Sequence, residues 1–266
     1  MDRIAFFTSL RRRKSGVFGT SLSQDQVEGV EAILDAGEGL PMSHLAYALG
    51  TAFGETGGRM QPITENMNYS ARRIPQVFSA RRLNGHSAAS LAGNPERLAA
   101  VVYGGILGNN TTGDGWTYRG HGLVQLTGKD NFRRMGDRVG VDLVRYPHLA
   151  LQMDISAKAL IAGIRDGIYT GKSASDYLPA TGRATRAEYV QARRIINGTF
   201  EADKYAGYAV AFEAALIAGG YQAAQPAQTP PVTTPSPRPT APRPTAPRPT
   251  RGIIAALAAF LRSLRG

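Results

Sequence analysis

Two glutamates, Glu55 and Glu65, lie ten positions apart and are followed by residues 118–127, where polar and apolar side chains mix. Two carboxyl groups and a segment that can hold a water are the minimum needed to hydrolyse a glycosidic bond. An inverting hydrolase needs its carboxyl groups roughly 6.5 to 9.5 Å apart, whereas about 5 Å indicates a retaining mechanism. The sequence does not decide between these separations, so both mechanisms remain open.

The first glutamate is expected at the end of a helix. Apolar spacing predicts a helix over residues 43–55, and Glu55 falls about 60° around its axis from Ala52, at the edge of the apolar face. Partial desolvation there favours the neutral acid, the form that a general acid needs. Glu65 is expected in a loop, where it can face Glu55 across a cleft. The alternative for each glutamate is an ordinary surface carboxylate.

Residues 123–127 are expected to be extended, so that Gln125 and Thr127 point to one side. Asn131, four residues further on in the following helix, lies within reach of the same side. These amides and hydroxyls are expected to orient a water or an N-acetyl group. Thr127 also fits the sequence pattern of a helix cap, and capping alone is the alternative role.

Trp116 and Tyr118 flank this segment, and their faces suit stacking on sugar rings, with core packing as the alternative. The chain has no cysteine, and its four histidines show no metal-ligand spacing. No Ser-His-Asp arrangement or phosphate-binding loop is recognisable. We therefore expect a site that uses neither a metal nor a cofactor.

The charge of the chain indicates an anionic partner. Its formal net charge is +11 and its pI is about 10.2, which fits nucleic acid, a lipid surface or an acidic cell-wall polymer. Beyond Glu213 no acidic residue occurs, and six arginines lie there: Arg238, Arg243, Arg248, Arg251, Arg262 and Arg265. A nucleic-acid-binding domain usually spreads its basic residues over a folded face, so we expect no nucleic-acid partner.

The 266 residues, of which 42% are hydrophobic, can bury one sizeable core and carry an appended segment. Residues 1–222 are predicted to form a mainly helical α+β domain with a small β-hairpin or sheet around residues 116–127. The predicted helices cover residues 24–36, 43–55, 95–103, 128–139, 153–166, 185–196 and 203–218. The apolar run Ile4-Ala5-Phe6-Phe7 is too short for a signal peptide or a membrane span.

Residues 223–251 are rich in Pro, Thr and Arg, and this composition predicts a linker. About 28 residues of polyproline II would reach on the order of 80 Å. Residues 252–266 are predicted to form a cationic amphipathic helix, with Leu257 and Leu261 on one side and Arg262 and Arg265 on the other. This helix is expected to contact an anionic membrane or lipopolysaccharide. Docking to a partner and a role in solubility are the alternatives.

An ordered series of motifs runs through residues 3–219, at positions 22–27, 32–35, 45–47, 55–56, 60–63, 65, 118–127, 140–143, 165–167 and 193–199. In these motifs the sequence resembles glycoside hydrolase family 19, the chitinase-like group that includes many bacteriophage endolysins. The resemblance implies a lysozyme-like, mostly helical fold and an inverting β-1,4-glycosidase that needs no cofactor.

The resemblance also implies roles for individual residues. Glu55 would be the general acid and Glu65 the general base, and Thr127 would position the water. Three residues correspond to positions of the substrate cleft: Gln125, Asn131 and Asn197. The sequence departs from the family at Gly54, where a histidine commonly precedes the acid.

These features predict a monomeric phage endolysin that hydrolyses the glycan strands of peptidoglycan. It would be made in the host cytoplasm without a signal peptide and would reach the periplasm after release by a holin-like agent. The enzymatic alternatives are a chitinase that cleaves poly-N-acetylglucosamine and a lytic transglycosylase, which needs a single acid. The alternative outside enzymes is a cell-wall-binding or membrane-active protein.

Overall fold

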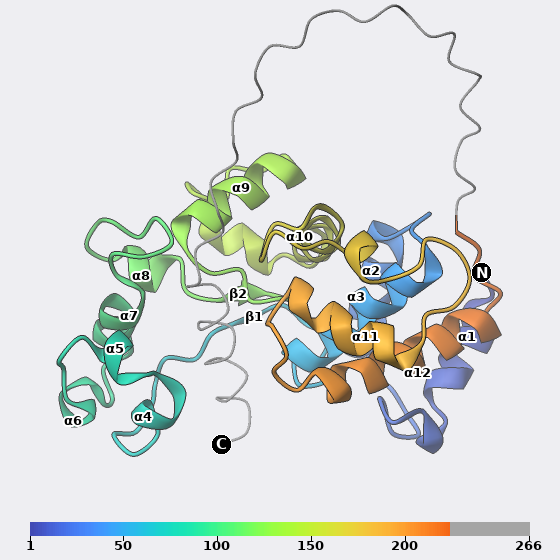
Figure 1. Ribbon diagram of the computed structural model, residues 1–266, viewed down its shortest axis with the longest axis horizontal. Helices are drawn as coiled ribbons and strands as arrows, with labels where there is room; N and C mark the ends of the chain where they lie inside the picture. The colour runs from blue at the N-terminus through green and yellow to red at the C-terminus, as the bar shows by residue number, and fades with distance from the viewer. Residues whose placement is uncertain (224–266) are drawn as a thin grey trace, which may run out of the picture.

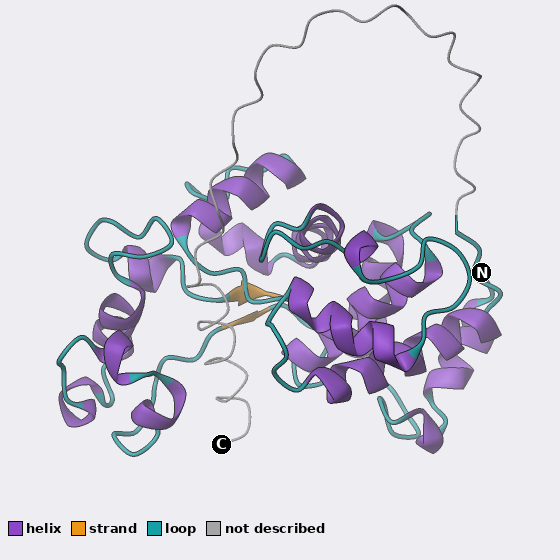
Figure 2. Ribbon diagram, in the orientation of Figure 1, coloured by secondary structure: helices purple, strands orange, loops and turns teal. Residues whose placement is uncertain are grey.

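The structure, a computed structural model, describes residues 1–223 (Figure 1). Nearly all of the predicted linker and the whole of the predicted cationic helix therefore lie outside the described residues. The described part forms two helical lobes with a short sheet between them (Figure 2). The predicted mainly helical α+β class is confirmed.

The large lobe is built around one extensive hydrophobic cluster. Its helices are α1 (Arg3–Leu10), α2 (Gln24–Ala36), α3 (Met42–Glu55), α9 (Lys129–Val139), α10 (Met153–Asp166), α11 (Arg186–Ala192) and α12 (Ala202–Ala218). Four short 3₁₀ helices accompany them: η1 (Arg13–Ser15), η2 (Pro147–Leu151), η3 (Ala174–Asp176) and η4 (Arg193–Ile195).

The small lobe has a separate hydrophobic cluster, which includes Ile74, Leu91 and Leu98. Its helices are α4 (Ile74–Val77), α5 (Ala80–Leu83), α6 (Ala88–Leu91), α7 (Pro95–Tyr103) and α8 (Asp114–Thr117). The sheet between the lobes pairs β1 (Ile63–Thr64) with β2 (His121–Gly122) in antiparallel register.

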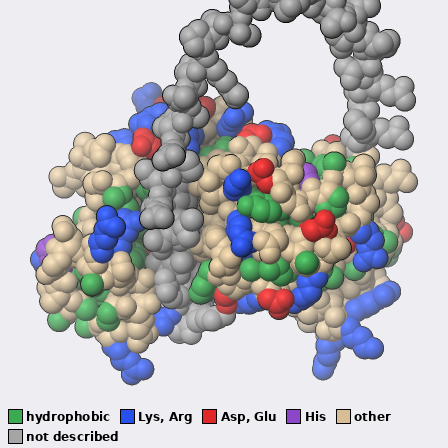
Figure 3. Space-filling view, in the orientation of Figure 1, with side chains coloured by type: hydrophobic (Ala, Val, Ile, Leu, Met, Phe, Trp, Pro, Cys, Tyr) green, Lys and Arg blue, Asp and Glu red, His purple; other side chains and the backbone are tan. Residues whose placement is uncertain are grey.

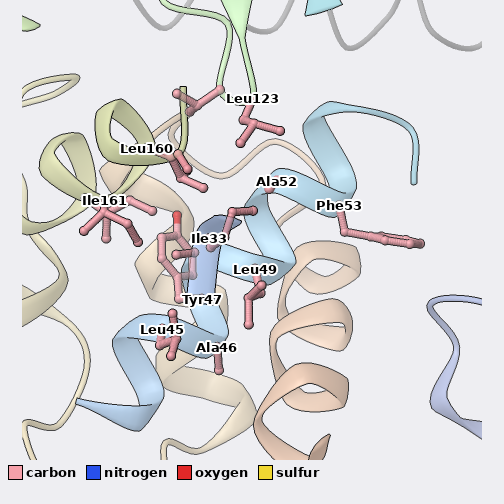
Figure 4. Packing of buried hydrophobic residues seen from close by; sticks show 14 of the residues in the cluster. Ile33, Leu45, Ala46, Tyr47, Leu49, Ala52, Phe53, Leu123, Leu160 and Ile161 are labelled. Atoms are coloured by element: carbon pink, nitrogen blue, oxygen red, sulfur yellow. The ribbon is translucent and has the colours of Figure 1, made fainter. Parts of the chain in front are cut away.

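Helix α3 is the centre of the large lobe, and nearly all of its residues are buried. Figure 4 shows its apolar side chains packed against α2, α10 and the hairpin that follows β2, with the labelled residues Ile33, Leu45, Leu49, Ala52, Leu123, Leu160 and Ile161. Helix α12 crosses α3 at Gly50, where an added Cβ would lie 2.7 Å from the backbone nitrogen of Ala209. Only glycine allows the two backbones to approach so closely.

Most of the predicted helices are found. Helices α2, α7 and α10 have the predicted bounds, and α3, α9 and α12 each begin one residue away from the predicted start. The helix predicted over 185–196 divides into α11 and η4. Helix α1 was not predicted, although Asp2 caps it by accepting a hydrogen bond from the Ala5 N–H at 3.0 Å.

The small β-hairpin predicted around residues 116–127 is found, but the extended conformation expected for residues 123–127 is not. Residues 114–117 form α8, and β2 contains only His121 and Gly122. Gly122 and Gln125 have φ angles of 88° and 56°, so the chain turns back and His121 pairs with Leu126. The hairpin is tighter than expected, because residues 123–125 form its turn and not a strand.

The surface seen in Figure 3 carries Lys and Arg side chains on several elements, with Asp and Glu side chains among them. Within residues 1–223, no helix is both long enough and apolar enough to cross a membrane.

Candidate active site

Glu55 is the last residue of α3, and its position follows from the way the helix ends. Gly57 and Gly58 have φ angles of 59° and 82°, a conformation that favours glycine. The Gly58 N–H donates to the Phe53 carbonyl at 2.7 Å, so the chain leaves the helix directly after the glutamate. The Glu55 side chain is fully buried, more deeply than the predicted place at the edge of the apolar face.

Glu55 forms an ion pair with Arg193, the first residue of η4. Nη1 of Arg193 lies 2.8 Å from Oε1 of Glu55, and both side chains have no exposed surface. The guanidinium of Arg193 stacks on the ring of Tyr205, 3.7 Å from its centroid. The three side chains bring the end of α3, the start of η4 and helix α12 together in the core of the large lobe.

Burial raises the pKa of Glu55, and the positive charge of Arg193 opposes this change. Desolvation is the larger of the two effects, since it penalises the charged form of a carboxyl group that water cannot reach. The neutral acid is therefore favoured to a higher pH than for an exposed glutamate. This is the protonation state that a general acid requires.

Gly54, where the resemblance leads us to expect a histidine, has a steric explanation. A Cβ added at residue 54 would lie 2.3 Å from Cε1 of Tyr205. The tyrosine ring thus occupies the space into which any side chain at this position would project. In this protein an aromatic ring from α12, and not a side chain from α3, lies beside the glutamate.

Glu65 directly follows β1, and its N–H donates to the Gly120 carbonyl at 2.8 Å. Its carboxyl group accepts two hydrogen bonds, one at each oxygen. The Tyr103 hydroxyl donates to Oε1 at 2.7 Å, and the Gly120 N–H donates to Oε2 at 3.2 Å. The side chain is 2% exposed, so the alternative of a surface carboxylate is wrong for Glu65, as it is for Glu55.

Burial raises the pKa of Glu65 to about 7, although its two hydrogen bonds and the positive charge of Arg119 act in the opposite direction. A carboxyl group with a pKa near neutrality exchanges protons readily at physiological pH. Each of the two glutamates thus has a perturbed pKa with an identified physical cause, which is typical of functional carboxyl groups.

The hairpin after β2 brings Gln125 next to Glu65. Nε2 of Gln125 donates to the carbonyls of Ile63 and Gly122, each at 2.9 Å, and so fastens β1 to the hairpin. A Cβ added at Gly120 would lie 2.4 Å from Oε1 of Gln125 and 3.2 Å from Cβ of Glu65. Because residue 120 is a glycine, the side chains of Gln125 and Glu65 can both pack against its backbone.

Thr127 and Asn131 continue this chain of contacts. The Thr127 hydroxyl donates to the Gln125 carbonyl at 2.8 Å, and Nδ2 of Asn131 donates to the Thr127 carbonyl at 2.6 Å. Arg134 donates to Oδ1 of Asn131. The residue that caps α9 is Gly128, without a side-chain bond, so a capping role for Thr127 is wrong.

The remaining predicted residues lie at different depths. Trp116 is partly buried against the small-lobe cluster, and the guanidinium of Arg119 lies 3.6 Å from the centroid of its ring. Tyr118 is buried, and its hydroxyl donates to the Val144 carbonyl at 2.9 Å, so its ring packs in the core. Asn197 is buried close to the ion pair, and its N–H donates to the Arg193 carbonyl at 2.9 Å. For Tyr118 the structure shows the alternative, core packing, whereas stacking of Trp116 on a sugar stays a prediction.

Three residues that contact the glutamates were not predicted: Tyr103, Arg193 and Tyr205. Arg193 belongs to one of the motifs that carry the family resemblance, and this was the sequence feature that could have indicated its place in the site. Tyr103 and Tyr205 have the appearance of core residues in helical patterns. Their contacts with the glutamates are made across the fold, where local spacing carries no information.

The described residues contain no group of three or more His, Asp or Glu side chains that could hold a metal ion. The arrangement that they do contain is a mainly helical domain with two buried carboxyl groups, one paired with a cation and one held by two neutral donors. Each of these carboxyl groups is of a type that can take part in acid–base chemistry.

No model of a protein family matches the chain. The chain is 36% identical over 109 residues to a glycosyl hydrolase family 19 domain-containing protein of Haemophilus influenzae. That match covers 40% of this chain and 54% of the relative, so the chain spans about half the length of the curated relative it matches. The similarity agrees with the family resemblance of the sequence motifs.

Two solved structures are also similar. Chitinase C from Streptomyces griseus HUT6037 matches with a TM-score of 0.42 and 15% identity over 82% of this chain and 78% of that chain. A bacterial family 19 chitinase matches with a TM-score of 0.39 and 16% identity over 78% of this chain and 95% of that chain.

Proposed function

We propose that this protein is a glycosidase that hydrolyses the β-1,4 bonds of bacterial peptidoglycan by an inverting mechanism. The observation that carries the proposal is the pair of buried carboxyl groups in two different environments. Glu55 is the general acid that protonates the departing sugar oxygen. Glu65 is the general base that takes a proton from the attacking water.

The other predicted residues have supporting roles in this proposal. Thr127 positions the water, and Gln125, Asn131 and Asn197 contact the glycan. The hydrogen bonds among Gln125, Thr127 and Asn131 hold these three residues in fixed positions before the substrate binds, which lowers the entropic cost of reaching the transition state. Trp116, which is only partly buried, is proposed to offer a ring face to the sugars.

Burial of both carboxyl groups adds a requirement to this mechanism. Since Glu55 is fully buried and Glu65 is 2% exposed, the groups that cover them must move when a glycan strand enters. The two separate hydrophobic clusters allow the lobes to move relative to each other without opening either core.

The choice of peptidoglycan over chitin is supported by the net charge of +11, which favours an anionic polymer. A phage endolysin, released into the periplasm by a holin-like agent, is the biological setting that we propose. Cleavage of chitin is the second candidate, because the match with a family 19 domain-containing protein leaves the substrate open.

Digestion of purified sacculi and of chitin side by side tests this function. We expect release of muropeptides from sacculi, with one water added per bond cleaved, visible as a mass increase of about 18 Da over an anhydro product. NMR during the digestion should show the α-anomer first, because inversion of a β bond gives an α product. Anhydro ends would identify a lytic transglycosylase, and a β-anomer would contradict the inverting mechanism.

We further propose that residues 252–266 contact an anionic membrane such as the lipopolysaccharide layer. The supporting observation is the cationic amphipathic pattern of this sequence. Deletion of residues 223–266 should leave hydrolysis of purified sacculi unchanged and should reduce killing of intact cells from outside. The reduction should be larger at low salt, since surface charges are screened within about 10 Å at 0.1 M salt. Equal killing by the truncated protein would contradict this role.

A further inference from the structure

One hydrogen bond to Glu65 comes from the small lobe. Tyr103 is the last residue of α7 and lies 38 positions along the chain from the glutamate. Its ring belongs to the small-lobe cluster and is 2% exposed. Its hydroxyl nevertheless donates to Oε1 of Glu65 at 2.7 Å, the usual distance for a hydrogen bond between two oxygens.

The position of Tyr103 is fixed from the large lobe as well. Nδ2 of Asn109, a residue that is 1% exposed, donates to the Tyr103 carbonyl at 3.0 Å. Oδ1 of the same side chain accepts from the N–H of Lys129, the first residue of α9, also at 3.0 Å. Asn109 thus joins the end of α7 to the start of α9. This leaves the tyrosine little freedom to move away from the glutamate.

A buried carboxylate is costly unless donors replace the water it has lost. Glu65 has two such donors, the Gly120 N–H and the Tyr103 hydroxyl, and each serves one oxygen. The backbone donor is fixed by the fold of the hairpin. The tyrosine is therefore the side chain on which the charged state of this carboxyl group depends most directly.

We propose that Tyr103 is a positioning residue for Glu65, whose hydroxyl holds the carboxylate in place and stabilises its charged form. This inference rests on the proposed role of Glu65 as general base. It gives the small lobe a part in the chemistry, because α7 supplies the donor that makes the base available.

Other charged and titratable groups act on this pair. The positive charge of Arg119 favours the charged form of Glu65, while Tyr69 and Arg82 act on Tyr103 from the small lobe. Burial and the neighbouring Glu65 raise the pKa of the Tyr103 hydroxyl well above its usual value. The hydroxyl therefore keeps its proton and remains a donor over the whole range in which Glu65 titrates.

The test is Tyr103→Phe, which removes the hydroxyl and keeps the ring. The acidic limb of the kcat/KM–pH profile, which reports ionisation of the base in the free enzyme, should move to higher pH by about one unit. Activity on the acid side of the limb should then fall about tenfold, with much of it regained at higher pH.

A matched control exists elsewhere in the large lobe. The Tyr189 hydroxyl donates to Oε1 of Glu213 at 3.1 Å, and both residues are buried. Tyr189→Phe removes the same type of bond and should leave the pH profile of hydrolysis in place. An equal effect of the two substitutions on the profile would overturn the proposal, because it would indicate a general loss of stability.

A titration that does not depend on turnover separates this inference from the proposed function. The ¹³C-labelled carboxyl carbon of Glu65, assigned by its absence in Glu65→Gln, should titrate at higher pH in Tyr103→Phe than in the unaltered protein. An unchanged titration would overturn the proposal. A shifted titration with an unshifted kinetic profile would confirm the contact but remove Glu65 as the base, and the positioning role would fall with it.

If the variant does not fold, a second NMR measurement can be made on the unaltered protein. The phenolic carbon of Tyr103 should change its chemical shift as Glu65 gains or loses its proton, because the hydroxyl bonds to that carboxyl group. A chemical shift of the Tyr103 phenolic carbon that stays constant while Glu65 titrates would overturn the proposal.

Discussion

Replacement of Glu55 by Gln is expected to lower kcat by about 10² to 10⁴, the usual contribution of a general acid. Glutamine has the shape of the neutral carboxylic acid but cannot give up a proton to a leaving sugar. Binding to purified sacculi should persist, because the shape of the site is kept. Release of muropeptides and pull-down with sacculi measure the two properties. Undiminished turnover would remove Glu55 from the mechanism.

The unfolding free energy of the same variant shows whether the Glu55 carboxyl group is neutral or charged beside Arg193. If Glu55 is the neutral acid opposite Arg193, Gln should keep the unfolding free energy close to that of the unaltered protein. Breaking a buried charged pair would instead cost about 3 to 5 kcal/mol. A loss of that size would identify Glu55 and Arg193 as a structural ion pair. Glu213→Gln, which alters another buried carboxyl group, is the control that should retain turnover.

Replacement of Glu65 by Gln is expected to abolish the activity and to stabilise the fold above neutral pH. The pKa of Glu65 is about 7 in the folded protein, against an ordinary value of 4.5. Between these two values the folded protein holds the proton more tightly than the unfolded chain does. The stability of the unaltered protein therefore falls as the pH rises through this interval and stays lower above it.

Glutamine cannot ionise, so this loss is absent from Glu65→Gln. The difference in unfolding free energy between the variant and the unaltered protein should move in favour of the variant by about 3 kcal/mol from pH 4.5 to pH 8. Urea denaturation at the two pH values measures it. A difference that does not change with pH would contradict a raised pKa at Glu65, whatever the absolute stabilities are.

The sequence predicted the long elements well and their contacts poorly. Helices such as α2 and α10 have apolar faces that repeat with the helical period, and this signal is local. The four-residue helices α4, α5, α6 and α8 are too short to show a period. The hairpin after β2 depends on the φ angle of Gln125, which no pattern of polar and apolar residues specifies.

The residue types of the candidate site could be predicted from the sequence, but the burial and the contacts of these residues could not. The spacing of Glu55 and Glu65 indicated a carboxyl pair, yet their burial depends on Arg193, Tyr205 and Tyr103, which arrive from other helices. Such contacts are a property of the packed fold. Their absence from the sequence pattern explains why both glutamates could be interpreted as surface residues.

The division of the described residues into two hydrophobic clusters has a consequence for how the protein would be inactivated. A cluster built partly on four-residue helices can open on its own, at a lower free energy than the whole molecule. Opening of the small lobe would withdraw the Tyr103 hydroxyl from Glu65 while Glu55 and Arg193 stay enclosed. Mild heat or denaturant would then abolish the proposed hydrolytic activity while most of the helical backbone is still intact.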